Sequence, residues 1–237
     1  MRNLIATNRA LMAALAVGAL LVSAAVAVSL LTSHRGQDRA VHAHPSPNPS
    51  TSPVPTGPLS LIRGARLTDG LEVGYPHTYI GAVSAAADYL DAVASTLDPD
   101  YAASVMRIAG DPDKSALADD LAASTVTLRS DLQLATSGPL SPPVAFVTTA
   151  QMYQLRDASA DDLLVLLLTD STFIDARGGM AHTTGVFPVR MHWTAGDWKL
   201  EAIGGGQDFS ALSATPDTQA AASEGWFALI AAAGGAS

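Results

Sequence analysis

Two carboxylates, Asp88 and Asp91, have the spacing to do acid–base chemistry. They lie three residues apart in a segment that predicts a helix, so they share one face of it with Ser84 and Ser95. Two carboxylates on one face can give and accept a proton when their surroundings separate their pKa values. The same pattern is also typical of the solvated side of an amphipathic helix, and this is the interpretation we adopt.

Other residues with possible chemistry give weaker signals. His42 and His44 could form a metal clip, but they lie in a Pro/Ser-rich stretch that we interpret as a solvated tether. The triple glycine Gly204-Gly205-Gly206 lacks the lysine and the strand–turn–helix setting of a phosphate loop. The cysteine count of 0 excludes a thiol nucleophile, a cysteine-based zinc site, a disulfide and a lipidated cysteine. We therefore expect no catalytic, cofactor-binding or metal-binding residue, no cofactor and no enzymatic activity.

Composition narrows the class of partner. The net charge is −9 and only 13 residues are Lys or Arg, so phosphate backbones would be repelled and nucleic acid is not expected as a partner. Hydrophobic residues make up 48% of the chain, enough for one packed core.

An apolar segment at the N-terminus predicts a membrane anchor. Leu11 to Thr32 carries no charge and no proline, and about twenty such residues span a bilayer as a helix. Arg2 and Arg9 make the N-terminal flank slightly more positive, which favours a cytoplasmic N-terminus and an extracytoplasmic remainder. The alternative is a signal peptide cleaved near Ala27, which would release the domain. We expect residues 1–33 to form the anchor and residues 34–66 a disordered Pro/Ser-rich linker.

The carboxylate pair would be positioned by the first of three predicted helices. Thr78 is its expected N-cap, and its apolar stripe runs to about Thr96. Asp98-Pro99 and Asp111-Pro112 each combine a capping aspartate with a proline at the first helical position, so they predict two further helix starts.

The next part of the chain predicts strands. Val144–Leu155 and the apolar run Leu163–Phe173 precede a hairpin built from His182–Trp193 and Asp197–Ile203. The register places three pairs on the core face: Trp193 with Trp198, Met191 with Leu200, and Val189 with Ala202. The opposite face pairs His192 with Lys199 and Arg190 with Glu201.

The C-terminal residues predict a helix from Pro216 to Ala233, with Trp226, Phe227 and Ile230 as its apolar contacts. Packing on the domain itself and docking of a partner both remain open, so these three residues are candidate partner contacts. We expect a folded domain over 67–209 and a C-terminal helix and tail over 210–237.

The order of helices followed by strands, ending in the hairpin sequence WTAGDWK (Trp193 to Lys199), resembles the nuclear transport factor 2-like (SnoaL-like) family. The resemblance covers Gly70 to about Gln207. It implies an α+β cone in which about three helices pack on a curved antiparallel sheet. Enzymes of that family carry an acid, a histidine or a tyrosine inside the cone, and the corresponding candidates are Asp88, Tyr89, Asp170, His182 and His192.

A narrower resemblance includes the anchor, the tether and the segment GYPHTYIGAVSAAADYL from Gly74 to Leu90. Together these are similar to uncharacterised actinobacterial membrane-anchored proteins associated with conjugative elements, which share the layout of single-span type IV secretion scaffold subunits. The resemblance implies a non-enzymatic scaffold that associates with itself or with other proteins. A small-ligand-binding or SnoaL-like enzymatic domain, and an accessory protein of a lipid-import (Mce) complex, are the alternatives.

Overall fold

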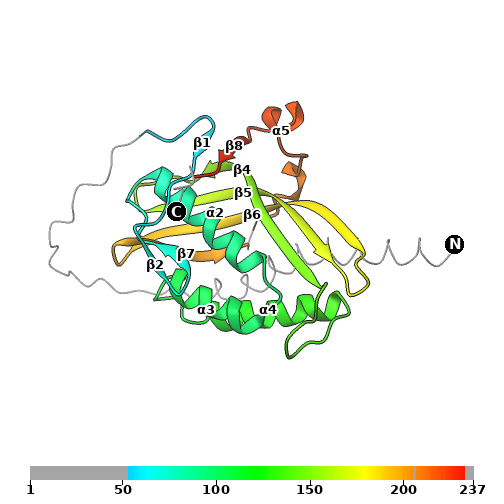
Figure 1. Ribbon diagram of the computed structural model, residues 1–237. Helices are drawn as coiled ribbons and strands as arrows, with labels where there is room; N and C mark the ends of the chain where they lie inside the picture. Colours follow the sequence, from blue (N-terminus) through cyan, green and yellow to red (C-terminus); the bar gives the residue numbers. More distant parts are fainter. Residues whose placement is uncertain (1–52, 205–206, 233–237) are drawn as a thin grey trace.

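The computed structural model describes residues 53–204 and 207–232 (Figure 1). Its main feature is a six-stranded sheet with the strand order β1-β8-β4-β5-β6-β7, beside a two-stranded sheet of β2 and β3. The strands are β1 (Leu59–Ser60), β2 (Arg66–Thr68), β3 (Leu71–Val73), β4 (Ala145–Arg156), β5 (Asp162–Ile174), β6 (Met180–Thr194), β7 (Asp197–Ile203) and β8 (Phe227–Ile230).

The helices are few. They are α2 (Tyr79–Ala94), α3 (Pro99–Ala109), α4 (Leu117–Asp131) and the short α5 (Gln219–Ser223), with a 3-10 turn η2 (Ser210–Leu212). Figure 1 shows α2 lying across the sheet, with α3 and α4 following one another at one end of it.

Two of the predicted helix starts are confirmed. The Thr78 hydroxyl accepts a hydrogen bond from the backbone N–H of Gly81 at 3.0 Å and begins α2. The Asp98 carboxylate accepts from the N–H groups of Asp100 and Tyr101, and Pro99 opens α3. Each cap satisfies donors that the first turn of a helix leaves without a partner.

The third predicted start, at Asp111-Pro112, is wrong, because α4 begins only at Leu117. The backbone N–H of Asp111 bonds to the carbonyl of Leu200 on β7 instead, at 2.8 Å. Its carboxylate accepts from Asp113 N and contacts His192. The aspartate therefore fixes a loop against the edge of the sheet rather than capping a helix.

The hairpin of β6 and β7 confirms the expected pairs of Trp193 with Trp198, Met191 with Leu200 and His192 with Lys199. Beyond them the register was predicted wrongly. A bulge between Arg190 and Met191 pairs Arg190 with Ala202, and Val189 with Ile203.

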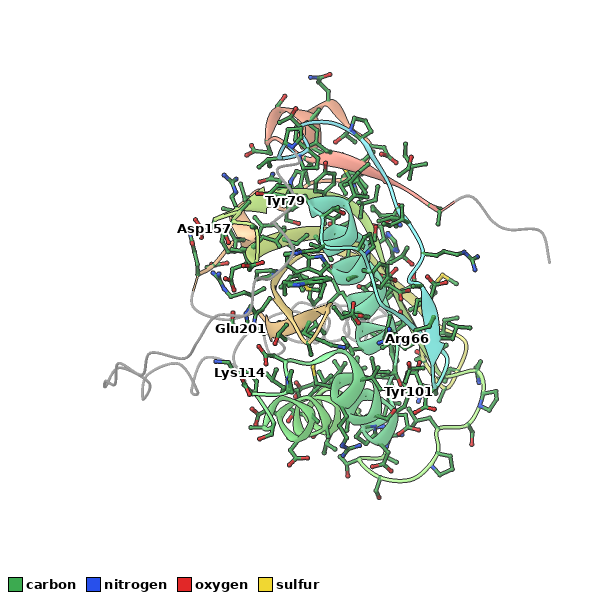
Figure 2. All side chains as sticks on the ribbon, turned by 90° about the vertical axis from the view of Figure 1, so that its left-hand side faces the viewer. Arg66, Tyr79, Tyr101, Lys114, Asp157 and Glu201 are labelled. Carbon is green, nitrogen blue, oxygen red and sulfur yellow. The ribbon has the colours of Figure 1, made fainter. Side chains whose placement is uncertain are left out.

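Glu201 is the extra residue of this bulge, so it does not face Arg190 as expected. Its carboxylate instead lies 3.6 Å from the ammonium of Lys114, which follows α3. Figure 2 labels both residues, Glu201 on β7 and Lys114 in the loop between α3 and α4.

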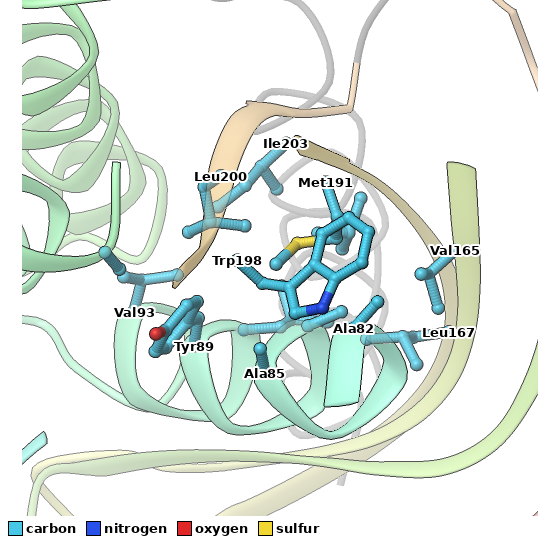
Figure 3. Close-up of a cluster of buried hydrophobic side chains, with 14 of the residues drawn as sticks. Ala82, Ala85, Tyr89, Val93, Val165, Leu167, Met191, Trp198, Leu200 and Ile203 are labelled. Atoms are coloured by element: carbon cyan, nitrogen blue, oxygen red, sulfur yellow. The ribbon is translucent and has the colours of Figure 1, made fainter. Parts of the chain in front are cut away.

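Both faces of the sheet are covered near its centre. On one face, fully buried Trp198 packs among α2 and the strands, where Figure 3 labels Ala82, Ala85, Val165, Leu167, Met191 and Leu200 around it. On the other face, Leu166, Leu168 and Met152 pack against Ala221 and Trp226 of the C-terminal segment. The apolar run of β5 is therefore buried on both sides, as expected for a central strand.

The expected C-terminal helix is wrong. Over its described residues, 216–232, this segment contains only the five-residue α5, and Phe227–Ile230 forms β8, which pairs antiparallel with β4 at Met152 and Tyr153. The linker expected up to residue 66 also ends early, since Leu59–Ser60 forms β1 and pairs in parallel with β8. Residues from both ends of the domain thus extend one edge of the sheet.

The nuclear transport factor 2-like α+β cone is also a wrong expectation. The domain is mostly sheet with a few helices, its main sheet is mixed rather than antiparallel, and the C-terminal segment covers the outer face of that sheet. Over residues 53–204 and 207–232, no helix combines the length and apolarity needed to cross a bilayer. The predicted anchor Leu11–Thr32 and residues 34–52 of the predicted linker lie outside the described residues.

Asp197, at the start of β7, joins the hairpin to the segment that enters α2. Its carboxylate is 1% exposed and accepts from the backbone N–H groups of Gly74 at 2.9 Å, Tyr75 at 3.0 Å and Trp198 at 2.9 Å. The Lys199 ammonium lies 3.4 Å from it. A buried carboxylate with this many donors is satisfied on both oxygens.

We expect Asp197→Asn to lower the free energy of unfolding by about 3 kcal/mol, because one amide NH₂ would face backbone donors and leave them without an acceptor. Urea unfolding monitored by tryptophan fluorescence measures the change. Asp157→Asn is the matched control, since Asp157 is exposed in a turn at φ 45°, which asparagine tolerates. Equal stability of the two variants would contradict the role given to Asp197.

Candidate functional site

An apolar cavity of about 50 Å³ lies between the helices and the main sheet. The end of α2, the middle of α4 and strands β4, β5 and β6 form its walls. Its apolar lining is Val93, Ala94, Leu121, Leu128, Phe146, Gly185 and Phe187, and its polar lining is Thr96, Ser124, Thr125, Thr148, Ser171, Thr183 and Thr184. None of these side chains is ionisable at ordinary pH, so the cavity can bind but holds no general acid or base.

Two buried hydroxyl side chains of the lining contact each other across neighbouring strands. Thr148 on β4 is 2% exposed and Ser171 on β5 is 5% exposed, and their oxygens lie 2.9 Å apart. Other hydroxyls of the lining bond to the backbone of α4: Ser124 donates to the Asp120 carbonyl and Thr125 to the Leu121 carbonyl. The Thr148–Ser171 pair was missed by sequence reasoning, because isolated Thr and Ser in strands carry no recognisable spacing.

The polar face of α2, which we expected to be solvated, instead contacts the rest of the chain. Ser84 accepts from Ile62 N, Asp88 accepts from the Tyr75 hydroxyl, and Asp91 accepts from Ala150 N. Ser95, after the last turn, both donates to the Thr148 carbonyl and accepts from its N–H. Since β8 covers β4 only at Met152 and Tyr153, Asp91 and Ser95 satisfy the edge of β4 where no strand reaches it.

Burial changes the acidity of both carboxylates on this face. Burial raises the pKa of Asp91 to about 7; the hydrogen bond from Ala150 opposes this rise and the nearby Asp88 charge adds to it. Burial also raises the pKa of Asp88, partly offset by the hydrogen bond from Tyr75, with Glu72 adding to the rise. Perturbed carboxylates are candidates for catalysis. Here each one bonds to a group that holds α2 in place, and neither lines the cavity.

His192 forms an ion pair that also serves the fold. Its Nδ1 lies 2.8 Å from the Asp111 carboxylate, and this hydrogen bond, opposed by burial, raises the pKa of His192. Burial would raise the pKa of Asp111, but the hydrogen bonds from His192 and Asp113 N outweigh it and leave that pKa lowered. An Asp–His pair can prepare a base, but neither residue of this pair lines the cavity.

A second histidine contact was not anticipated. The His77 ring stacks on half-buried Trp193 with the centroids 4.1 Å apart, and its Nε2 lies 2.8 Å from the Asp161 carboxylate and 3.0 Å from the Ala160 carbonyl. Both acceptors face the same nitrogen, so Nε2 carries the proton and donates. The contact ties the start of α2 to the β4–β5 turn and to the hairpin.

The five residues named through the family resemblance do not converge. Tyr89 is fully buried beside Tyr75, and burial, with the Asp197 charge, raises its pKa. His182 and Asp170 lie 3.6 Å apart on the sheet face opposite the cavity. Asp88 contacts Tyr75 and His192 contacts Asp111, so the set is divided among three places. Among the described residues, no group of three or more His, Asp or Glu side chains could hold a metal ion, and His42 and His44 lie outside them.

The three candidate partner contacts also differ from one another. Trp226 is 2% exposed, and its indole N–H donates to the Leu212 carbonyl, so it packs within the domain. Phe227 is half-buried against Tyr153, whereas Ile230 is 51% exposed at the edge formed by β1 and β8. Only Ile230 of the three presents a largely exposed side chain.

Comparisons with known proteins give a family and weak structural likenesses. The model of a family described as "Domain of unknown function (DUF8175)" matches residues 58–226. No curated protein matches. A putative calcium/calmodulin dependent protein kinase II association domain from Xanthomonas campestris is similar at 12% identity over 55% of this chain and 89% of that chain, with a TM-score of 0.37. The intermembrane space region of the chloroplast protein ARC6 is similar at 16% identity over 52% and 89%, with a TM-score of 0.32.

We expect the stability of the protein to fall as the pH rises from 4 to 8, through the titration of Asp91. Its pKa is raised to about 7 in the folded chain, so its contribution is fully present below the ordinary value near 4 and is lost as the pH passes 7. Asp91→Asn keeps an oxygen for Ala150 N and removes the charge, so it should be more stable than the wild type at pH 8 by on the order of 2 kcal/mol.

Urea unfolding at pH 4.5, 6 and 8 measures this difference, with Asp157→Asn as the control for loss of an exposed carboxylate. The advantage of Asp91→Asn should shrink at pH 4.5. A difference that does not change with pH would show that Asp91 titrates at its ordinary value.

Proposed function

Since the chain belongs to the DUF8175 family, whose function is unknown, we propose from its own residues that it is a non-enzymatic, membrane-tethered binding domain. It acts outside the cytoplasm as a scaffold or accessory protein of a conjugative-transfer or secretion-type assembly. Leu11–Thr32 holds it in the membrane, and residues 34–58 separate the domain from the bilayer.

The observation that supports binding rather than catalysis is the lining of the cavity, which has no ionisable side chain. The perturbed carboxylates and the histidine pairs lie elsewhere, and each holds two elements of the fold together. A catalytic site needs a proton donor or acceptor within reach of a bound substrate. In this domain those groups form contacts within the fold.

Protein partners are favoured by the exposed apolar side chains. Met180 is 70% exposed, Val147 is 53% exposed and Ile230 is 51% exposed, all on β-strands of the main sheet. The net charge of −9 disfavours nucleic acid. Ile230 is the residue chosen to test this contact, because its side chain is largely exposed on β8, next to the edge strand β1.

The test is site-specific photocrosslinking of the full-length chain in its native membranes. A photoreactive phenylalanine replaces Ile230 in one variant and exposed Tyr101 of α3 in the matched control, and adducts are identified by mass spectrometry. We expect adducts specific to position 230 that contain transfer or secretion subunits, or a second copy of the chain.

Adducts with lipid-import subunits would support an accessory role, but in a lipid-import complex instead of a transfer or secretion assembly. Identical adducts at both positions, or no protein adducts at position 230, would overturn the proposed protein contact. Two substitutions of titratable residues test whether the contact depends on acid–base groups. His192→Gln and Asp91→Asn should leave the position-230 adducts unchanged.

A further inference from the structure

The residues that line the cavity limit the charge of a ligand that it can bind. Its lining holds apolar and hydroxyl side chains and no cation or anion. Moving a charged group into such surroundings is costly, because nothing there replaces its hydration. An uncharged ligand is therefore selected.

The buried hydroxyls add a requirement for a hydrogen-bond acceptor. Within the 2.9 Å contact of Thr148 and Ser171, one hydroxyl donates and the other accepts, which uses one of the two protons. Within the described residues, neither hydroxyl has a further partner, so one proton remains available at the wall of the cavity. Both side chains are more than nine-tenths buried, and a buried donor without an acceptor costs free energy.

The volume limits the size of the group that enters. About 50 Å³ is one third of the ~150 Å³ apolar cavity that accommodates benzene. The space therefore admits only one end of a ligand, such as an acetyl group, and the rest of the ligand must lie outside it.

We propose that this cavity binds the uncharged aliphatic ketone, ester or alcohol group of a small ligand, with its oxygen accepting from the Thr148–Ser171 hydroxyl pair. The inference rests on the proposed non-enzymatic function and names the ligand class that the domain recognises. The same chemistry is offered by a free small molecule and by the ester carbonyl of a lipid, and the experiment separates these two sources.

The probe is butan-2-one, titrated into the full-length chain in lipid nanodiscs and followed by NMR of labelled leucine and valine methyl groups. Val93, Leu121 and Leu128 line the cavity and should shift saturably. Butanoate has the same number of carbons and a charge, so it should not bind. Nanodiscs of ester-linked and ether-linked lipids distinguish the sources, because a lipid ester in the cavity would compete with butan-2-one only in the former.

Two variants locate the site. Gly185→Ala adds a methyl group at ordinary contact distance, 3.4 Å from Phe187, and should weaken binding at least tenfold by filling the space. Ser171→Ala removes one hydroxyl and should weaken binding about fivefold. His192→Gln lies outside the lining and serves as the control, and thermal unfolding verifies that each variant folds.

Saturable shifts that are lost in Gly185→Ala and reduced in Ser171→Ala would support the proposal. Shifts and an affinity that are unchanged in Ser171→Ala would overturn the role of the hydroxyl pair. Absence of saturable shifts in both lipid types would mean that the cavity holds water only, and would overturn the ligand class. That failure would leave the crosslinks at position 230 intact, so it is distinguishable from failure of the proposed function.

Discussion

Helix α2 is buried on most of its sides, and much of the domain's architecture serves to pack its apolar side chains and to give its polar side chains hydrogen-bond partners. The sheet lies on one side, the segment from β1 to β3 on another and α3 at its end, so almost every residue from Gly81 to Leu90 is buried. Small alanines allow the close approach of these elements, because a larger side chain at those positions would need space that the packing does not leave. The polar residues of α2 must then find partners in neighbouring segments of the chain. They do so at Ile62, Tyr75 and Ala150.

This burial explains both the acidity and the location of the titratable groups. A carboxylate enclosed beside a strand edge gains a hydrogen bond and loses its water, and for Asp91 the loss of water dominates. The histidines at positions 77 and 192 likewise connect elements that are distant in the sequence. These ionisable side chains therefore lie at contacts between elements of the fold. The cavity at the end of α2 is left with hydroxyl and apolar groups, and this division favours a binding role.

Sequence reasoning succeeded where the determinants are local. The caps at Thr78 and Asp98 and the paired tryptophans of the hairpin depend on residues within a few positions of one another. It failed where a distant partner decides. Asp111-Pro112 has the sequence of a helix start, but the edge of β7 competes for its backbone and His192 for its carboxylate. Phe227–Ile230 fits a helix pattern, yet pairing with β1 and β4 makes it a strand. The role of Asp197 depends on Gly74 and Tyr75, more than a hundred residues earlier, so no spacing in the sequence indicates it.

The cavity also could not be predicted from the sequence, because residues of α2, α4 and three strands enclose it. The backbone at Gly185 does not require glycine, because its φ is not positive. A Cβ there would meet Phe187 at 3.4 Å and Thr169 at 3.9 Å, so an alanine fits without strain. Filling an apolar space of this kind ordinarily stabilises a protein, and alanine in a strand is less costly than glycine. A purely structural strand gives no reason to leave the space open, whereas a strand that shapes a binding cavity does.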